Sequence, residues 1–333
     1  MEVDRTRARR TASEAFQAQD ISASDADLTA EVLVTAEAMG KGSHGLIRLP
    51  RYVRGIDHGN VDPDGDIQVV RDNGATATID GGARLGPVVA SNTIVEAMDR
   101  ADEYGVGVVG AHNGNHLGMV EYYTEQARQE GYVALGMTNT EPAMPPFGGT
   151  EPILGTNPIA IGLPTDPPFN LDMSTSGIAR GTVLEKKEQG GTLPEGVALD
   201  ADGKPTTDPV EALDGTILPF GGAKGSGLAI AVEILAGGLV GAAMGQDVTG
   251  TYNTEDPCTK GDLFLAIDPD AMAGEDFAAE AGAFLEALKS GPTSDGFDEV
   301  LLPGEHSLRR ERRTKMITVD DEVWENVQAL AGE

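Results

Sequence analysis

The sequence of 333 residues contains little cysteine, few positive charges and few aromatic side chains. Cys258 is its only cysteine, so the chain cannot form an internal disulfide, and zinc sites built from two to four thiolates are excluded. Chains without disulfides are typical of reducing compartments. The sequence therefore predicts an intracellular, cytoplasmic protein.

Positive charge is scarce, because 24 lysine and arginine residues stand against 54 aspartate and glutamate residues, a formal net charge of −30. Phosphate backbones and anionic membrane surfaces are bound through lysine and arginine, so we expect neither nucleic acid nor a membrane as a partner. The acidic excess, with only eight lysines, predicts a halophilic protein, since molar salt screens self-repulsion within a few Å.

Long apolar runs are also lacking. The first 20 residues have a basic start but no apolar core behind it, so no secretory signal is expected. Residues 225–245 come nearest to a membrane span, but Glu233 lies near the middle and glycines interrupt the run. We expect a buried, closely packed helix there.

What is present is an alternation of helical and strand-like hydrophobic periods, which favours a mixed α/β architecture. We expect helices over residues 25–39, where Ser24 would begin a capping box, and over residues 91–104, 122–130, 225–244 and 276–288. Strands are expected at residues 67–70, 75–79, 106–109, 132–137, 158–163 and 263–267. Arg309 to Arg313 form a basic cluster, which we interpret as a solvated turn with ion pairs to the acidic surface.

Two glycine-rich segments resemble nucleotide-binding loops. Residues 105–110 match G-x-G-x-x-G, but the intervening valines form the expected strand, so a Rossmann loop is not predicted. Residues 221–226 lack the spacing of a phosphate loop. Lys224 and the glycines at a helix start could still bind an anion, or the glycines could only permit tight helix packing.

Two of the five histidines have sequence contexts that can expose an imidazole in a cleft. His44 lies in Gly-Ser-His-Gly and His116 in Gly-Asn-His-Leu-Gly. His112 and His116 lack a third ligand at suitable spacing, so we expect no metal.

Hydride transfer at a carbon that bears oxygen needs a group that moves a proton near pH 7, a cation that binds the substrate carboxylate, and a cofactor platform. His44, Arg48 and the glycine-rich segments are residues of these types. The alternatives are a histidine that only caps a loop and an arginine in a surface ion pair.

Several short motifs point to one family by their order and spacing. They are Ser43-His44-Gly45, residues 48–52, Asn115 to Gly118 with Tyr122-Tyr123, and residues 155–158, 172–176, 205–209, 221–225 and 303–305. With these motifs the sequence resembles, over nearly its whole length, the malate/L-lactate dehydrogenase family that lacks a Rossmann fold. That family also contains sulfolactate and ureidoglycolate dehydrogenases and a cyclic-imine reductase.

The resemblance implies a two-domain α/β fold with mixed sheets and helices. The NAD(P)-binding domain would span residues 117–287. A helical, catalytic domain would combine residues 1–116 with residues 288–333. The resemblance also implies a homodimer with its active site near the interface.

The same resemblance implies roles for individual residues. His44 would exchange a proton with the substrate oxygen, with Ser43 hydrogen-bonded beside it, although His116 is the alternative acid/base. Arg48 would pair with the substrate carboxylate and Tyr52 would line the pocket. NAD or NADP would contact His116, Leu117, Gly118, Thr140, Asp172, Met173, Ser174, Lys224, Gly225, Gly304 and Glu305.

Some positions leave questions open. Thr182 stands where the family often has Lys or Asp, which puts any relay role there in doubt. Lys186 and Lys187 could receive the 2′-phosphate of NADP or could be solvated.

We therefore expect an NAD(P)-dependent oxidoreductase that interconverts a small anionic 2-hydroxy acid and its 2-oxo acid, of the malate or L-lactate type. The enzyme alternatives are a sulfolactate or ureidoglycolate dehydrogenase or a cyclic-imine reductase. A catalytically silent dinucleotide-binding protein is the alternative of another class, and the presence of His44, Arg48 and His116 together argues against it.

Overall fold

The computed structural model describes residues 1–251, 253–274 and 276–333. Its centre is a seven-stranded sheet with the strand order β2-β3-β4-β10-β5-β6-β7. The strands are β2 (Gln68–Asn73), β3 (Thr76–Asp80), β4 (Val106–His112), β10 (Gly261–Ile267), β5 (Val133–Thr138), β6 (Ile159–Leu163) and β7 (Phe169–Met173). Only β3 and β4 pair in parallel, and the other neighbours are antiparallel. The expected mixed α/β architecture is confirmed.

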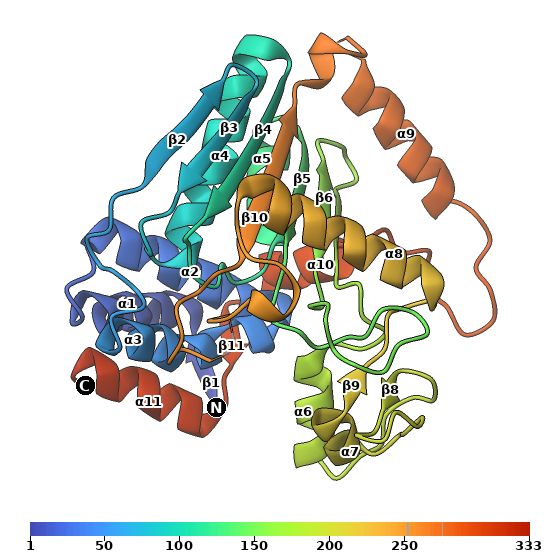
Figure 1. Cartoon of the computed structure of the whole chain (residues 1–333). Helices are drawn as coiled ribbons and strands as arrows, with labels where there is room; N and C mark the ends of the chain where they lie inside the picture. The colour runs from blue at the N-terminus through green and yellow to red at the C-terminus, as the bar shows by residue number, and fades with distance from the viewer. Residues whose placement is uncertain (252, 275) are drawn as a thin grey trace.

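Helices cover both faces of this sheet (Figure 1). On one face, α4 (Gly86–Tyr104) and α5 (Glu121–Gln129) share a core with Val109 and Ala111 of β4. On the other face, α8 (Ala223–Val232) and the turns after it pack against β10 and β5. Because side chains alternate along a strand, β4 serves both layers: Val108 packs on the second face. β4 extends beyond the expected residues 106–109 and contains both Gly107 and Gly110, so these glycines do not form a nucleotide loop.

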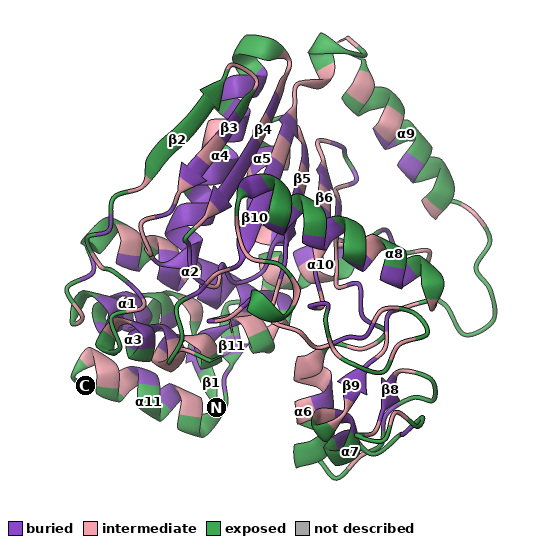
Figure 2. Cartoon of the chain, in the orientation of Figure 1, coloured by how far each residue is buried: buried purple, intermediate pink, exposed green. Residues whose placement is uncertain are grey.

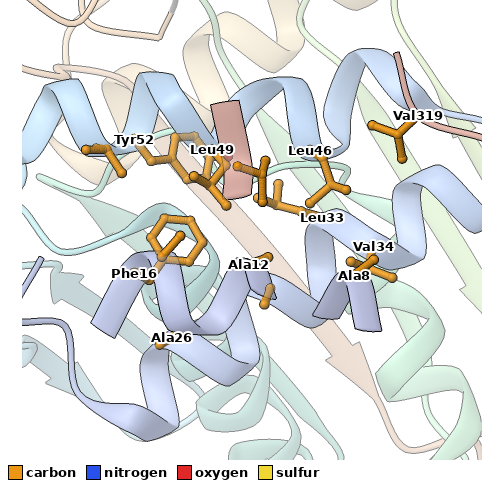
Figure 3. Packing of buried hydrophobic residues seen from close by; sticks show 14 of the residues in the cluster. Ala8, Ala12, Phe16, Ala26, Leu33, Val34, Leu46, Leu49, Tyr52 and Val319 are labelled. Carbon is orange, nitrogen blue, oxygen red and sulfur yellow. The ribbon is translucent and has the colours of Figure 1, made fainter. Parts of the chain in front are cut away.

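The two chain ends meet in a helical layer beside the sheet (Figure 1). It contains α1 (Arg5–Gln17), α2 (Ala23–Met39), α3 (Leu49–Asp57) and α11 (Asp321–Ala331), with β1 (Glu2–Asp4) paired to β11 (Met316–Thr318). Figure 3 shows Phe16, Leu33, Leu46, Leu49 and Tyr52 packed together in this layer. Each such side chain contributes about 2 kcal/mol when buried, so Leu46 and Leu49 fix the chain on both sides of Arg48.

The remaining elements are α6 (Arg180–Glu188), β8 (Ala198–Leu199), α7 (Pro209–Asp214), β9 (Thr216–Ile217), α9 (Phe277–Lys289) and α10 (Glu305–Arg313), with the short 3-10 turns η5 (Gly245–Asp247) and η6 (Pro269–Ala271). Of these, α6, α7, β8 and β9 lie together below the sheet in Figure 1, and α9 lies to its right. The basic cluster lies in α10, so the expected turn is wrong. The expected ion pairs are present, because Arg309 binds Glu299 and Glu305.

Two helix predictions need correction. α2 begins two residues before the expected position, because the side chain of Ser22, not Ser24, accepts a hydrogen bond from Asp25 N and caps the helix. The apolar helix after residue 223 is not one regular helix: α8 ends at Val232 and continues as the π turn η3 (Glu233–Gly237) and the 3-10 turn η4 (Gly238–Val240).

This apolar segment is also less buried than expected. In the part of the chain that the structure describes, Ala223–Val240 is the one helix long and apolar enough to cross a membrane by length and composition. Part of the segment packs on the sheet, whereas Ile230, Ile234 and Leu239 are exposed. Figure 2 shows both buried and exposed residues along α8. Buried Glu233 ties the segment to the body of the protein by accepting hydrogen bonds from Asn139 and Asn157.

The seven-stranded sheet contains strands from both sides of residue 116, where the expected domain boundary lies. The division into residues 117–287 and the two chain ends stays a prediction.

Candidate active site

A cavity of about 420 Å³ is lined by residues of the helical layer, the sheet and α6. This volume is typical of small-molecule sites. Its lining includes Lys41, Ser43, His44, Arg48, residues 116–120, Thr138, Thr140, Thr156, residues 172–174, residues 179–181, Thr251 and Lys260. The N-terminal motifs and those that follow β4 and β7 are thus brought to one place.

Local sequence explains why the first of these motifs faces the cavity. α2 ends at Gly40, which adopts the left-handed conformation that favours glycine, and two 3-10 turns follow, η1 (Gly42–His44) and η2 (Leu46–Arg48). Leu46, the first residue of η2, is buried in the helical core. His44 and Arg48, on either side of it, line the cavity.

The two histidines face each other across the site. The His44 and His116 rings stack with 6.0 Å between centroids and 21° between planes. His44 Nδ1 lies 3.0 Å from Ser43 Oγ. His116 Nδ1 accepts the Gly118 amide proton at 3.2 Å and lies 2.8 Å from the Tyr52 hydroxyl. Because Nδ1 is an acceptor, neutral His116 carries its proton on Nε2 and can donate it as a hydrogen bond.

Burial and positive neighbours keep both rings neutral at pH 7. Burial lowers the pKa of His44 to about 4, helped by Arg48 and Lys41 and opposed by Asp172. Burial, Arg48 and His44 hold the pKa of His116 well below its usual value. A neutral imidazole can accept a proton, so the site is arranged for proton abstraction from a bound hydroxyl group.

Lys41 is a cavity residue that the sequence interpretation missed. Its Nζ donates to Glu121 Oε2 at 2.6 Å and to Asp172 Oδ2 at 2.8 Å. Burial alone would lower the pKa of Lys41, but the two carboxylates outweigh it and raise that pKa. These two ion pairs join the end of α2 to α5 and β7. Its partners lie 80 and 131 residues away, so no local pattern indicates it.

Two further cations line the cavity and were also missed. Arg180 begins α6 and lies two residues before Thr182. Lys260 is buried and its Nζ contacts both carboxylate oxygens of Asp262, at 2.7 and 2.6 Å. Cations and carboxylates thus both line the cavity, because Glu141 and Asp172 also belong to its lining. Two of the cations, Lys41 and Lys260, are bound to carboxylates.

Some residues implied by the resemblance do not line this cavity. Tyr52 lies behind His116 and lines a small neighbouring hollow. Lys224 and Gly225 lie in the first turn of α8. Gly304 precedes α10, and the carboxylate of Glu305 binds Lys289 at 2.5 and 2.6 Å. The single chain therefore does not bring these last four residues to the two histidines.

The donor set suits a cofactor that carries hydroxyl and amide groups. Side chains with hydroxyl groups line the cavity at the ends of β5 and β7 and in the loop before β6; they are Thr138, Thr140, Thr156 and Ser174. The implied contacts that lie at the cavity are His116, Leu117, Gly118, Thr140, Asp172, Met173 and Ser174. Across the described residues, no group of three His, Cys, Asp or Glu side chains is placed to hold a metal ion.

Comparison with known proteins identifies the class. The chain belongs to the malate/L-lactate dehydrogenase family, whose sequence model matches residues 3–328. The resemblance expected from the motifs is confirmed.

Particular relatives carry narrower names. The L-sulfolactate dehydrogenase of Methanothermobacter thermautotrophicus is 45% identical, over 96% of this chain and 93% of that protein. The malate/(S)-sulfolactate dehydrogenase of Methanothermus fervidus is 42% identical, over 96% of this chain and 94% of that protein. The solved structure of the sulfolactate dehydrogenase from Methanocaldococcus jannaschii matches with a TM-score of 0.95 and 42% identity, over 100% of this chain and 97% of that one. Relatives named malate dehydrogenase, from Pyrococcus horikoshii, and L-lactate dehydrogenase, from Cupriavidus necator, are 37% and 34% identical.

Proposed function

We propose that this protein is an NAD(P)-dependent dehydrogenase that interconverts a 2-hydroxy acid carrying a second anionic group and the corresponding 2-oxo acid, with sulfolactate as the first candidate. The observation that carries the proposal is the pairing of two neutral histidines with Arg48 and Arg180 in one cavity. The names of the more similar relatives support the sulfolactate alternative above the malate or L-lactate expectation.

The second anion is argued from charge. A 2-hydroxy acid needs one cation for its carboxylate, and Arg48, four residues after His44, is suited to this role. Arg180 supplies a second guanidinium at the same cavity. The sulfonate of sulfolactate can pair with Arg180, whereas the methyl group of lactate cannot. A site that pairs a charged group of its substrate strongly rejects an analogue that lacks this group.

In this proposal, the chain's own residues orient the substrate and move one proton. Arg48 binds the carboxylate, and His116 Nε2 donates a hydrogen bond to the substrate oxygen. During oxidation, His44 takes the hydroxyl proton, and during reduction it returns that proton to the oxygen. In the free protein, the charge of Arg48 lowers the pKa of His44. An anionic substrate offsets that charge and so raises the pKa of His44, which favours the protonated ring that reduction requires.

A nicotinamide cofactor supplies the hydride acceptor or donor when it is bound. We propose that Thr140, Asp172, Met173 and Ser174 hold it beside the substrate. Roles for Lys224, Gly225, Gly304 and Glu305 stay predictions, as does the choice between NAD and NADP.

Malate is the second candidate, because its two carboxylates can use the same two arginines. A panel of 2-oxo acids, with NADH and with NADPH in low salt and in molar KCl, tests the proposal. We expect oxidation of at least one cofactor with sulfopyruvate and with oxaloacetate. No oxidation with any 2-oxo acid would reject the dehydrogenase function and favour the silent binding protein.

We also propose a homodimer. Ile230, Ile234 and Leu239 form an exposed apolar strip on α8 and the turns that follow it, and Leu239 is 64% exposed. A second copy of the chain would cover this strip. Sedimentation velocity of the wild type and of Leu239→Glu tests this: we expect a dimer that the substitution weakens, and a monomeric wild type would contradict it.

A further inference from the structure

Glu37 is an acidic residue near the end of α2 that the proposed chemistry does not use. Its Oε1 accepts a hydrogen bond from the Leu46 amide at 2.9 Å. Leu46 begins η2, the second of the two turns that carry His44 and Arg48. One carboxylate is therefore bound to the backbone between the two side chains that would act on the substrate.

The glycines of this segment show how closely the turns lie on the carboxylate. A methyl group at Gly45 would collide with Oε1 of Glu37, and one at Gly42 would lie 3.2 Å from Oε2. Gly45 has a φ of −93°, and its contact with Glu37 leaves no room for a methyl group there. The turns thus rest on the carboxylate at two points.

We infer that Glu37 is a positioning residue for the proposed reaction: its carboxylate holds the paired turns so that His44 and Arg48 face the cavity, and it holds them best when ionised. An ionised acceptor makes a hydrogen bond roughly twice as strong as a neutral one. The effect of Glu37 on catalysis rests on the proposed function. The contact between Glu37 and the turns does not depend on that function.

Burial raises the pKa of Glu37 to about 7, against the opposing effects of the Leu46 hydrogen bond and Arg310. The titratable and charged groups around this end of α2 are Arg310 on α10, Lys41 and His44 on the adjoining turn, Tyr122 on α5, and Arg5 and Arg9 on α1, which bind Glu31. Lys41 is itself bound by Glu121 and Asp172. Glu37 therefore titrates close to neutrality, well above His44.

This separation gives a distinct pH signature for oxidation of the hydroxy acid. His44 accepts the proton, and with a pKa of about 4 in the free enzyme it stays competent down to that pH. Loss of kcat/KM as the pH falls through about 7 would instead report Glu37. The neutral Glu37→Gln variant should behave at every pH as the wild type does at acid pH.

The test compares wild type, Glu37→Gln and the matched control Glu31→Gln on the same helix. We expect Glu37→Gln to lower kcat/KM about tenfold at pH 8.5, to lack the acid limb near pH 7, and to bind cofactor with unchanged Kd. The control should keep the wild-type profile. An acid limb near pH 7 that persists in Glu37→Gln, or an unchanged rate at pH 8.5, would overturn the inference.

A second variant reaches the same contact from the other side. Gly45→Ala leaves Glu37 ionisable but pushes the turn away from it, and we expect a similar fall in kcat/KM. Because both changes break one contact, the double variant should lose little more than either single variant. Full additivity of the two losses would contradict the shared contact.

Two measurements separate this inference from a merely structural role and from failure of the proposed function. Because the folded protein raises the pKa of this carboxyl from 4.5 to about 7, ionisation of Glu37 costs stability, which is lost as the pH rises from about 4.5 to about 7. Glu37→Gln should therefore not lower the Tm at pH 8.5. A lower Tm would mean that Glu37 serves stability. Hydrogen exchange of residues 42–48 in the ligand-free protein needs no turnover: we expect faster exchange, corrected for intrinsic rates, in Glu37→Gln, and equal protection would overturn the anchoring.

Discussion

At the scale of the residue, the site depends on where a few charges lie. Burial, Arg48 and Lys41 lower the pKa of His44, whereas Asp172 raises it. Burial also strengthens the interaction between charges, because the interior has a low dielectric constant. The result is a neutral imidazole beside a cation. Neither property follows from His44 or Arg48 alone.

The first prediction concerns the proton transfer. His44→Asn removes the base while keeping a polar side chain of similar size, so we expect kcat to fall about 10² to 10⁴-fold. Cofactor Kd, measured by fluorescence titration, should not change. His306→Asn, on the exposed side of α10, is the matched control and should keep wild-type turnover. Full turnover by His44→Asn would transfer the proton role to His116.

The second prediction concerns the second anion. Arg180→Gln should lower kcat/KM for sulfopyruvate by about 10 to 100-fold, because the sulfonate loses a charged partner. The rate with pyruvate, which lacks that group, should change much less. Arg313→Gln, an exposed arginine of α10, is the control. Equal losses for both substrates would show that Arg180 does not recognise the second anion.

At the scale of the element, the apolar periods predicted six strands of the sheet, and helices α2, α4, α5 and α9, within a few residues, but they missed the edge strand β7. They did not predict α1 or α11. Helix α1 contains four arginines and buries mainly small residues, such as Ala8 and Ala12, so its helical period is weak. It forms because α2 and α11 cover it.

Some residues of the site could likewise be predicted from sequence motifs, and others could not. His44, Ser43, Arg48 and His116 belong to short motifs that lie at one cavity. Lys41 has no motif, and its role depends on Glu121 and Asp172, which only the folded chain brings close. Residues that act through distant partners cannot be found from local pattern alone.

The third prediction concerns the break in the apolar helix. Glu233 in the π turn accepts hydrogen bonds from Asn139, Asn157 and the Gly245 amide. Glu233→Leu leaves these buried donors with fewer acceptors, so we expect the free energy of unfolding in urea to fall by about 3 kcal/mol. Glu233→Gln, which keeps one acceptor, should lose less. If Glu233→Leu were as stable as the wild type, the network would not hold the π turn in place.

At the scale of the whole molecule, the formal charge is −30, and the cavity lining contains several cations as well as the carboxylates of Glu141 and Asp172. The cations are Lys41, Arg48, Arg180 and Lys260. The overall field repels anionic cofactor and substrate, while these local cations attract them. Salt should screen the repulsion between dispersed surface charges more than it screens partly buried contacts.

The fourth prediction follows from this charge. We expect the Tm to rise between low salt and molar KCl, because screening weakens self-repulsion in the folded state. Differential scanning calorimetry measures it. A Tm that stays constant or falls would reject the halophilic interpretation without affecting the proposed reaction.

The central claim is that the site acts on a 2-hydroxy acid with a second anionic group. The most direct measurement is kcat/KM for sulfopyruvate and for pyruvate with the preferred cofactor, in the same molar KCl buffer. We expect a ratio of at least about 100 in favour of sulfopyruvate, since a site that pairs a charged group rejects an analogue that lacks it. A ratio near one, or a preference for pyruvate, would contradict it.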